Sequence, residues 1–559
     1  MSWRWPGFGK QAPKPPGSQR RAGKRRDSDS AQEERKPEIR EFFGHYREKL
    51  TEAGPLSRRL DDNLQRVKTE FSDWSDLVVR KTTVGERQIR VAVCYVASIV
   101  DSKSIAQSIL WPLGEDSREL GETAYYSPGA TLTRIKGMGV SIGDLADVKD
   151  FETLAMAVLT GKCVILVDGI SQAVAADVRQ PPSRNVTEPS AETIIRGSRK
   201  AFTESIETNI GLIRKRLKTP DLKLKTMEVG RRSKTKIALM YLEGVVNPGL
   251  VEEVVKRING IDIDVILESG YIEQFIEDNW LSPFPQCEAT ERPDMIVAAI
   301  AQGKVVLLTD GSPMVLEIPS TLNNLMHSPE DIYQRWMVAS TVRFLRFVAT
   351  LISLTLPSFY IALTSYHPEM LPTELALTIG AARQGVPFPS FVEAFIMELA
   401  LELLREAGIR LPAPMGQTVG IVGGLVVGEA AVRAGLVSPA MVVVVATTAI
   451  ASFAIPNYGA SIASRLNRFW LMICTTVLGL YGFMLGLLVV LSHLSGLKTF
   501  GVSYMSPFAP LSLSALRDTI VRLPLFTLRR RASYLRPVDT TTMDKVRDDP
   551  TKRGGSEWG

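Results

Sequence analysis

The longest apolar stretches of this 559-residue chain lie in its second half and carry almost no charge. Four runs between Phe347 and Leu497 contain no Lys, Arg, Asp or Glu. Each run reaches the roughly 18–20 apolar residues that a bilayer-spanning helix requires. Soluble cores rarely supply several such runs so close together, so the pattern predicts an integral membrane protein. The runs are Phe347–Tyr366, Leu411–Gly428, Ala434–Ser464 and Phe469–Leu497.

The first half contains two copies of a strand-and-helix pattern. An alternating run at Ile89–Tyr95 recurs at Ile237–Tyr241, and Asp168-Gly169 recurs as Asp310-Gly311. The two markers keep the same order at nearly equal offsets, which predicts two α/β subdomains of similar fold. We interpret each Asp-Gly pair as the turn that ends a buried strand rather than as a ligand site.

The predicted fold class is an α+β cytosolic region with two similar α/β subdomains, followed by an α-helical multi-span membrane domain. A cationic patch in the helical stretch Ala201–Leu217 is interpreted as a solvated face, or else as a contact with a neighbouring subunit or lipid. The patch comprises Arg214, Lys215 and Arg216. The expected divisions are a disordered basic tail (1–40), a helical segment (41–85), subdomain 1 (86–182), a linker and helix (183–234), subdomain 2 (235–328), a membrane domain with about four spans (335–500) and an amphipathic basic C-terminal tail (501–559).

Charge and cysteine usage narrow the class of protein. The net charge of +6 is matched by the first forty residues alone, so it indicates a basic tail near an anionic membrane face rather than nucleic-acid binding. The four cysteines form no CxxC pair, which is typical of a reducing compartment. With four scattered histidines and no nucleophile, Walker or metal motif, we expect no enzyme, no metal site and no cofactor.

Regularly spaced glycines predict close helix packing in the apolar region. Glycine costs about 1 kcal/mol relative to alanine inside a helix, so a glycine every four residues suggests a packing advantage. In bilayers, small residues at this spacing let helix backbones approach closely. The predicted packing positions are Gly416, Gly420, Gly424 and Gly428, with Gly482 and Gly486 in the last run.

A helix predicted to start at Ser438-Pro439 carries one stripe that includes two hydroxyls. Such a face can line a pore with a hydrophobic constriction, and it can equally bond backbone or neighbouring helices. Both interpretations stay open from the residues alone. The pore-lining candidates are Met441, Val445, Thr448 and Ser452.

The helical segment 387–408 is unusual because it carries four glutamates. Each carboxylate at the centre of a bilayer costs about 2.5–3.5 kcal/mol on insertion scales. We therefore expect a re-entrant or interfacial helix, or one that faces water inside an assembly, where acidic groups attract cations. An interfacial helix with ordinary salt bridges is the competing interpretation. The four residues are Glu393, Glu398, Glu402 and Glu406.

Arginines indicate the orientation of the membrane domain. Arg335, Arg343 and Arg346 precede the first run, and arginine clusters favour the cytoplasmic side. The arginine-rich stretch from Arg517 to Arg536 suggests a cytosolic C-terminal part against anionic headgroups. Both ends on one side require an even number of spans.

Several sequence motifs resemble those of the A subunits of GerA-type spore germinant receptors. The resemblance covers about residues 75–540. Ser198 and Ala201 depart from the Pro and Gly of the family pattern, and the long basic N-terminus lies outside it. The motifs are Arg196–Ser205, Leu212–Arg216, Tyr366–Met370, Gly385–Pro389, Arg405–Pro412, Ile450–Tyr458 and Ser506–Pro510.

The resemblance implies a multi-pass protein of the spore inner membrane whose N-terminal region lies in the spore core. It implies two partners, a transporter-like B subunit that binds the nutrient and a C-subunit lipoprotein. It also implies a homo-oligomer, a pentamer, that acts as a nutrient-gated channel for monovalent cations. The alternatives are an A-like paralogue of the dipicolinate-release system and a non-conducting membrane scaffold.

Overall fold

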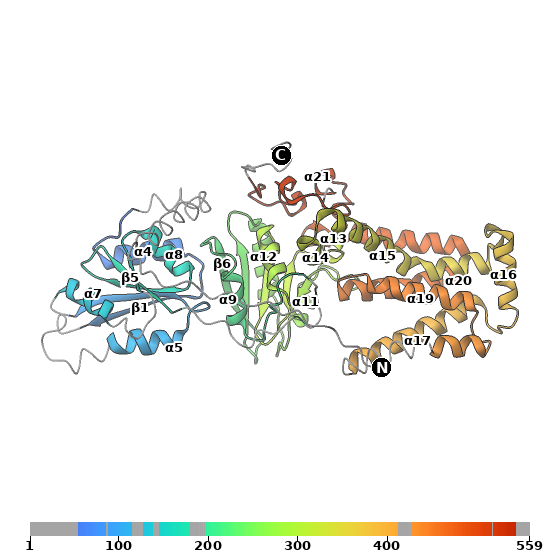
Figure 1. The fold of residues 1–559 in the computed structure, drawn as a ribbon, viewed down its shortest axis with the longest axis horizontal. Coiled ribbons are helices and arrows are strands. Elements are labelled where there is room, and N and C mark those ends of the chain that lie inside the picture. Colours follow the sequence, from blue (N-terminus) through green and yellow to red (C-terminus); the bar gives the residue numbers. More distant parts are fainter. Residues whose placement is uncertain are drawn as a thin grey trace, which may run out of the picture.

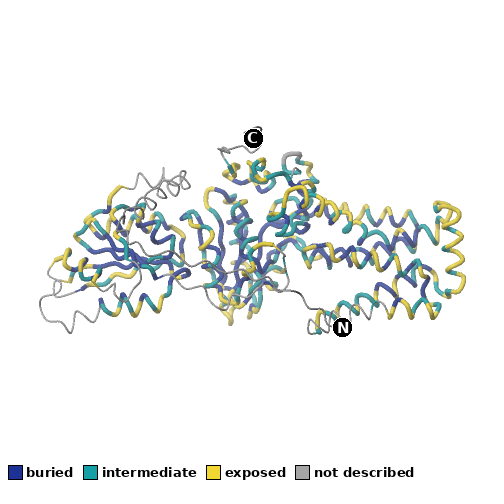
Figure 2. The backbone as a smooth tube through the Cα atoms, in the orientation of Figure 1, coloured by how far each residue is buried: buried dark blue, intermediate teal, exposed yellow. Residues whose placement is uncertain are grey.

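The computed structural model describes residues 54–84, 88–113, 127–137, 145–178, 189, 192, 194, 196–411, 424, 426–516 and 518–543. Two α/β subdomains and a bundle of long helices follow one another along the longest axis of the molecule (Figure 1). Buried backbone runs through both sheets and along the long helices (Figure 2). The expectations for the basic tail (1–40) and for Gly416 and Gly420 lie outside the described residues.

The first subdomain is a five-stranded antiparallel sheet with strand order β1-β2-β4-β5-β3. Every residue from Val91 to Val96 in β2 is buried, so both faces of the sheet are covered. The elements are α4 (Leu60–Glu70), β1 (Leu77–Val84), β2 (Ile89–Val96), α5 (Ser102–Ile105), the π-helix η1 (Ala106–Leu110), α7 (Pro128–Gly137), β3 (Leu145–Val148), α8 (Phe151–Leu159), β4 (Lys162–Val167) and β5 (Ala173–Asp177).

The second subdomain repeats this topology, with strand order β6-β7-β9-β10-β8. The predicted α/β sheets are therefore present, and their shared strand order explains the duplicated sequence pattern. The elements are α9 (Ile206–Arg214), β6 (Leu222–Val229), β7 (Thr235–Leu242), α10 (Pro248–Asn259), α11 (Ser269–Ile276), β8 (Glu288–Thr290), α12 (Pro293–Ala301), β9 (Val305–Thr309) and β10 (Val315–Ile318).

The repeated Asp-Gly pairs have a local structural role. Asp168 Oδ1 accepts a hydrogen bond of 2.9 Å from the backbone N–H of Leu60, at the start of α4. Asp310 Oδ1 accepts the equivalent bond of 3.3 Å from Ile206, at the start of α9. A carboxylate at a helix N-terminus satisfies a free N–H and interacts favourably with the helix dipole. Each following glycine has a positive φ, +89° and +85°, which suits a tight turn.

Each sheet begins one strand earlier than the sequence pattern predicts. The expected helical segment 41–85 contains β1, and the expected linker and helix 183–234 contain β6. Both are edge strands of their sheets, where they pair with β2 and β7, and β6 also forms one isolated bridge from Leu224 to Trp74 of the first subdomain. Their exposed positions carry charged and polar residues, so neither strand reads as the apolar run that identifies a central strand.

A buried arginine joins the two subdomains. The prediction of a solvated or lipid-facing patch is wrong for Arg214, which lies between them. Its guanidinium donates to both carboxylate oxygens of Asp76, at 2.7 and 2.8 Å. The same group lies 3.4 Å from the centre of the Trp74 ring, a cation–π contact. Asp76 and Trp74 precede β1, so this arginine holds the first sheet to α9.

The third region is a bundle in which α15, α17, α19 and α20 contact one another. By length and composition alone, α15 and α20 could each cross a bilayer. Two short helices, α13 (Leu322–Leu325) and α14 (Glu330–Tyr333), connect the second sheet to the bundle. The longer elements are α15 (Trp336–Ser365), the 3-10 turn η3 (Pro368–Met370), α16 (Thr373–Arg383), α17 (Ser390–Arg410), α19 (Pro439–Phe453) and α20 (Tyr458–Gly496).

The element α20 is a hairpin of two helices rather than one straight helix. Gly479 has φ +60° and ψ −139°, which is not a helical conformation. A Cβ at Gly486 would lie 2.9 Å from Leu471 Cδ2, although a straight helix would separate these positions by about 22 Å. The two arms therefore lie side by side. The predicted single run Phe469–Leu497 is divided because glycine permits the reversal at position 479.

Residues 498–543 fold against the second subdomain. The predicted contact of this basic stretch with lipid headgroups stays a prediction. The backbone N–H of Val538 donates to Val245 O at 2.9 Å. Arg531 Nε donates to Ala301 O at 2.8 Å. The elements are β11 (Lys498–Thr499), β12 (Val502–Ser503), α21 (Leu513–Leu516), η4 (Leu525–Thr527) and η5 (Ser533–Leu535).

Replacing Gly211 with alanine is expected to destabilise the chain, because the added Cβ would overlap the carbonyl oxygen of Ser98 in the first subdomain. Overpacking of this kind costs about 1–3 kcal/mol. The measurement is the midpoint of denaturant unfolding of the soluble subdomains within the purified full chain.

The matched control is Gly137→Ala in α7, since its Cβ would meet no described atom within 4 Å. Alanine is the better helix former, so this variant should keep or slightly raise the midpoint. Equal midpoints for the two variants would contradict the close approach of α9 to the first sheet.

Candidate functional site at the start of the first apolar helix

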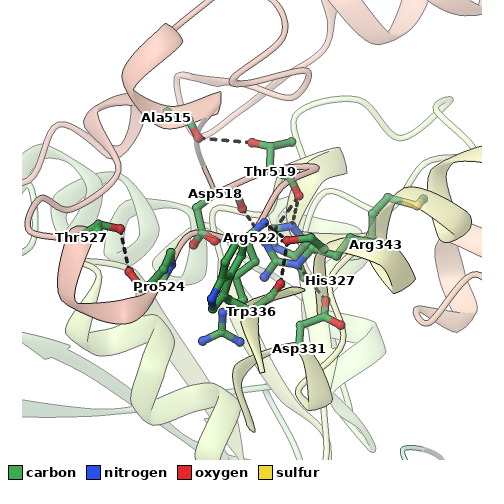
Figure 3. A network of polar contacts seen from close by, with 12 residues as sticks. His327, Asp331, Trp336, Arg343, Ala515, Asp518, Thr519, Arg522, Pro524 and Thr527 are labelled. Carbon is green, nitrogen blue, oxygen red and sulfur yellow. Dashed lines mark hydrogen bonds and ion pairs between the residues drawn. The ribbon is translucent and has the colours of Figure 1, made fainter. Parts of the chain in front are cut away.

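Asp331 is buried where the second subdomain meets the first apolar helix, with 3% of its side chain exposed. Its Oδ2 accepts hydrogen bonds from Arg343 Nε at 3.0 Å and from Arg346 Nη1 at 2.9 Å. Its Oδ1 accepts a third from Arg346 Nη2 at 3.3 Å. Both arginines lie on α15, immediately before its uncharged part. One carboxylate of α14 therefore fixes the start of α15 (Figure 3).

Arg343 on α15 also binds the C-terminal segment. Arg343 Nη1 donates to the backbone oxygen of Asp518 at 2.7 Å and to its carboxylate at 3.1 Å. Close by, His327 Nε2 lies 3.1 Å from the carbonyl oxygen of Thr519 (Figure 3). The stretch His327–Asp331 and the start of α15 thus meet the C-terminal segment, which is distant from both in sequence, at one largely buried cluster. We call this cluster the junction: His327, Asp331, Arg343, Arg346, Asp518 and Thr519.

Within the junction, Asp331 is charged and His327 is neutral at neutral pH. Burial by itself raises the pKa of Asp331, but the hydrogen bond and charge of Arg346 and the charge of Arg343 outweigh it, and the pKa is lowered. Its stabilising contribution is therefore present above the unfolded pKa of 3.8 and is lost as the pH falls through the folded value. Burial, and then the charge of Arg343, lowers the pKa of His327 to about 3, so its ring is neutral.

The shared bonds of the junction tie three segments of the chain together. Removing one partner of a buried ion pair leaves an uncompensated charge and costs about 3–5 kcal/mol. Because Asp331, Arg343 and Asp518 share their bonds, α14, α15 and the C-terminal segment are expected to move together. Within the described ranges, no group of three or more His, Cys, Asp or Glu side chains could hold a metal ion.

The predicted pore-lining stripe of α19 faces the inside of the chain's own bundle in this conformation. All four side chains are buried. Met441 and Val445 lie among apolar residues of α15, α17 and α20. The two hydroxyls donate to carbonyl groups one turn earlier in the same helix, at 2.8 and 2.7 Å. The stripe is therefore covered by neighbouring helices. Its residues are Met441, Val445, Thr448 and Ser452.

The acidic helix, α17, packs within the bundle alongside α15, α19 and α20. Its predicted re-entrant or interfacial placement in a bilayer stays a prediction. Glu398 and Arg468 of α20 form a buried pair at 3.0 Å. Glu402 lies 3.5 Å from Arg465, one turn earlier on α20. The cost that argued against a bundle position applies to unpaired carboxylates, and here the arginines of a later helix neutralise them.

The remaining two glutamates of α17 lie in different environments. Glu393 is fully buried, where it pairs with Arg383 at 3.3 Å and accepts a hydrogen bond of 2.8 Å from the backbone N–H of Ser438. Glu393 therefore accepts a hydrogen bond from the backbone N–H of the residue that precedes α19. Glu406 is exposed and pairs with Arg410 in the next turn of its own helix. The four residues form no continuous acidic surface on the single chain.

The described glycines of the predicted packing set are placed as follows. Gly482 and Gly486 lie between the two arms of the α20 hairpin, facing Cys474 and Leu471. A Cβ at Gly428 would meet Val442 Cγ1 at 3.4 Å, an ordinary contact. At Gly424 it would meet no described atom within 4 Å. Close approach at glycine is thus a feature of the last hairpin.

Comparison with known proteins identifies the relatives of this chain. The family model described as Bacillus/Clostridium GerA spore germination protein matches residues 65–534. This chain belongs to the GerA family. The membership that the sequence motifs predict is confirmed.

The relatives of this GerA chain match most of its length. It is 40% identical to spore germination protein KA of Bacillus subtilis (strain 168) over 89% of this chain and 90% of that protein. It is 38% identical to spore germination protein GerLA of Bacillus cereus over 88% and 99%. The solved N-terminal domain of the A subunit of the Bacillus megaterium spore germinant receptor GerK3 is 33% identical, with a TM-score of 0.37, over 47% of this chain and 96% of that domain.

Sequence reasoning used two members of the junction of this GerA chain, Arg343 and Arg346, only as orientation signals. It overlooked Asp331 and Asp518. One signal was available, because two arginines three residues apart share a helix face and need a carboxylate if that face is covered. The return of the C-terminal segment, 175 residues beyond Arg343, leaves no comparable mark in the sequence.

Replacing Asp331 with asparagine is expected to destabilise this GerA chain by about 3–5 kcal/mol, because two buried guanidinium groups lose their shared carboxylate. We expect a lower thermal midpoint of the full chain and faster proteolysis between the second subdomain and α15.

The control is Asp262→Asn, which removes an exposed pair with Arg231 on the same subdomain. Exposed pairs contribute little to stability, so the control should melt like the unmodified chain. If Asp331→Asn melted in the same way, the junction would not be a structural constraint.

Proposed function

We propose that this chain is the A subunit of a nutrient germinant receptor in the inner membrane of the endospore, where its oligomer releases monovalent cations to start germination. The observation that carries the proposal is the inverted polarity of the helix bundle. Large apolar side chains face outward from it and ion pairs face inward. This distribution suits a lipid surround and a polar path inside the protein.

The outward faces support a membrane location for the bundle. Val443, Ile450 and Phe453 of α19 are 65–73% exposed. Val477 and Leu488 extend the apolar surface over both arms of α20. Soluble monomers rarely expose contiguous apolar patches of this extent, whereas lipid-facing helices require them.

The inward faces support an ion path. The buried pair of Glu398 with Arg468 lies inside the bundle, next to the pair of Glu402 with Arg465. The hydroxyls of Ser353 and Ser358 on α15 are buried without a hydrogen-bond partner among the described residues. Ionisable groups inside membrane segments commonly mark ion pathways. We propose a path along the buried stripe of α19, with Val445 at its constriction, that opens when α17 moves away from α19.

The contacts at the base of the bundle support one cytosolic face. The second subdomain approaches both ends of the α20 hairpin, through Pro285 at Gly459 and through Ser282, whose hydroxyl lies 2.9 Å from His493 Nε2. We therefore propose that both α/β subdomains lie in the spore core. The junction would then carry a signal from these subdomains to α15.

We propose that the chain acts in a receptor complex, because the solved GerK3 relative is by name an A subunit of a receptor. The partners are a transporter-like B subunit that binds the nutrient and a C-subunit lipoprotein, with the A subunit itself a homo-oligomer, a pentamer. Its outward apolar faces would contact lipid, these partners and neighbouring copies.

Replacing Val445 with alanine is expected to widen the constriction and to raise cation leak several-fold without nutrient. The measurement is potassium current through the full complex reconstituted in a planar bilayer, together with ion retention by dormant spores. Val443→Ala is the matched control, since that valine is 65% exposed on the opposite side of the same helix. It should leave the current unchanged.

The outcomes separate the alternatives. Current in the unmodified complex with no effect of Val445→Ala would move the path away from α19. An assembled complex that carries no cation current under nutrient would support a non-conducting scaffold.

A further inference from the structure

A cavity of about 490 Å³ lies beside the junction, between the second subdomain, the start of α15 and the C-terminal segment. Its lining combines charged and amide groups with apolar side chains such as Met295 and Leu528. This volume is in the range of small-molecule sites. The polar residues that matter here are Glu288, Lys304, Asn324, Arg343, Arg522 and Arg530.

Most charges around the cavity already have partners. Burial, and then the charge of Glu317, raises the pKa of Glu288 to about 8, so this carboxyl is largely neutral at pH 7 and adds little repulsion. The remaining ion pairs balance one another. They are Lys304 with Glu317, Arg343 and Arg346 with Asp331 and Asp518, and Arg531 with Asp539.

Two cationic side chains are left over. Neither Arg522 nor Arg530 forms an ion pair with any residue that the structure describes. Arg522 is 3% exposed, and its Nη1 is buried without a hydrogen-bond partner among the described residues. Burial lowers the pKa of Arg522 and outweighs the charges of Asp518 and Asp331, which act on it. A buried guanidinium nitrogen without a hydrogen bond is costly, which distinguishes Arg522 from an ordinary surface arginine. Figure 3 shows Arg522 next to Asp518, beside the junction.

A second residue that lines the cavity also carries an unsatisfied donor. Asn324 Nδ2 is buried and has no hydrogen-bond partner in the described part of the chain. Asn324 belongs to α13 of the second subdomain, whereas Arg522 belongs to the C-terminal segment. Two unsatisfied donors from different segments therefore line one cavity that carries excess positive charge.

We propose that this cavity binds a phosphate group, held by Arg522 and Asn324 with Arg530 at the mouth. A guanidinium matches the geometry of phosphate oxygens, and two unpaired cations match the charge of phosphate near neutral pH. Bound phosphate links the C-terminal segment to the second subdomain beside Asp331, so it stabilises the junction. The proposal does not depend on ion conduction.

The phosphate has two sources that share this chemistry. One is a free phosphate or small phosphorylated molecule, which the cavity volume accommodates. The other is a phospholipid headgroup, because Trp336 and Met337 at the start of α15 are exposed close to the junction. The experiment uses the full chain in neutral detergent, with inorganic phosphate as one arm and nanodiscs with or without phosphatidylglycerol as the other.

Thermal unfolding followed by tryptophan fluorescence is the measurement, because a ligand of the folded state raises the midpoint with its concentration. A rise with inorganic phosphate, at matched ionic strength, assigns a soluble ligand. A rise only in phosphatidylglycerol nanodiscs assigns a headgroup. In either arm, Arg522→Gln should weaken binding at least about tenfold, since a hydrogen bond to a charged group is lost.

Arg232→Gln is the matched control, because Arg232 is 80% exposed on the turn after β6 and does not line the cavity. It should respond like the unmodified chain. Asn324→Ala gives a second test if Arg522→Gln does not fold, with a weakening of about fivefold expected. No stabilisation of the unmodified chain in either arm would overturn the proposal, as would equal losses for Arg232→Gln and Arg522→Gln.

Discussion

The bonds of one buried carboxylate to two arginines set the geometry of this molecule. Asp331 binds Arg343 and Arg346, which lie three residues apart on α15, so the helix is fixed against both sliding and rotation. The rest of the bundle packs on α15. The direction of the bundle relative to the second subdomain therefore follows from these few bonds. A hydrophobic contact at this place would hold the helix with far less directional precision.

Buried arginine–carboxylate pairs also join other parts of the chain. Arg214 with Asp76 joins the two sheets, Arg343 with Asp331 joins the second sheet to the bundle, and Arg468 with Glu398 joins helices inside it. Buried ion pairs add little net stability compared with well-packed apolar groups, but their partners tolerate few alternatives. The molecule can therefore be described as rigid units with defined contacts, which suits the proposed relay of a signal from the subdomains to α15.

Sequence patterns predict the individual strands and helices better than the tertiary contacts between them. Alternation reveals β2 and β7 because both are central and apolar, whereas the edge strands β1 and β6 carry polar residues and escape the pattern. Uncharged runs locate most of α15 and α20, yet they do not reveal the reversal at Gly479, which depends on one backbone conformation. Glu398 looks too costly for a bundle until Arg468 is known to lie beside it. Junction residues such as Asp331 and Asp518 escape for the same reason, since their partners are set by tertiary structure.

The pairing of α17 with α20 also constrains how the protein is made. Glu398 leaves the ribosome 70 residues ahead of Arg468, so the acidic helix is synthesised well before the helix that neutralises it. In a bilayer, a lone α17 would hold uncompensated carboxylates at an energetic cost. The pair of Glu398 with Arg468 can therefore form only after the first arm of the last hairpin has been synthesised. The packing of α17 against α20 is then a late step in folding of the bundle.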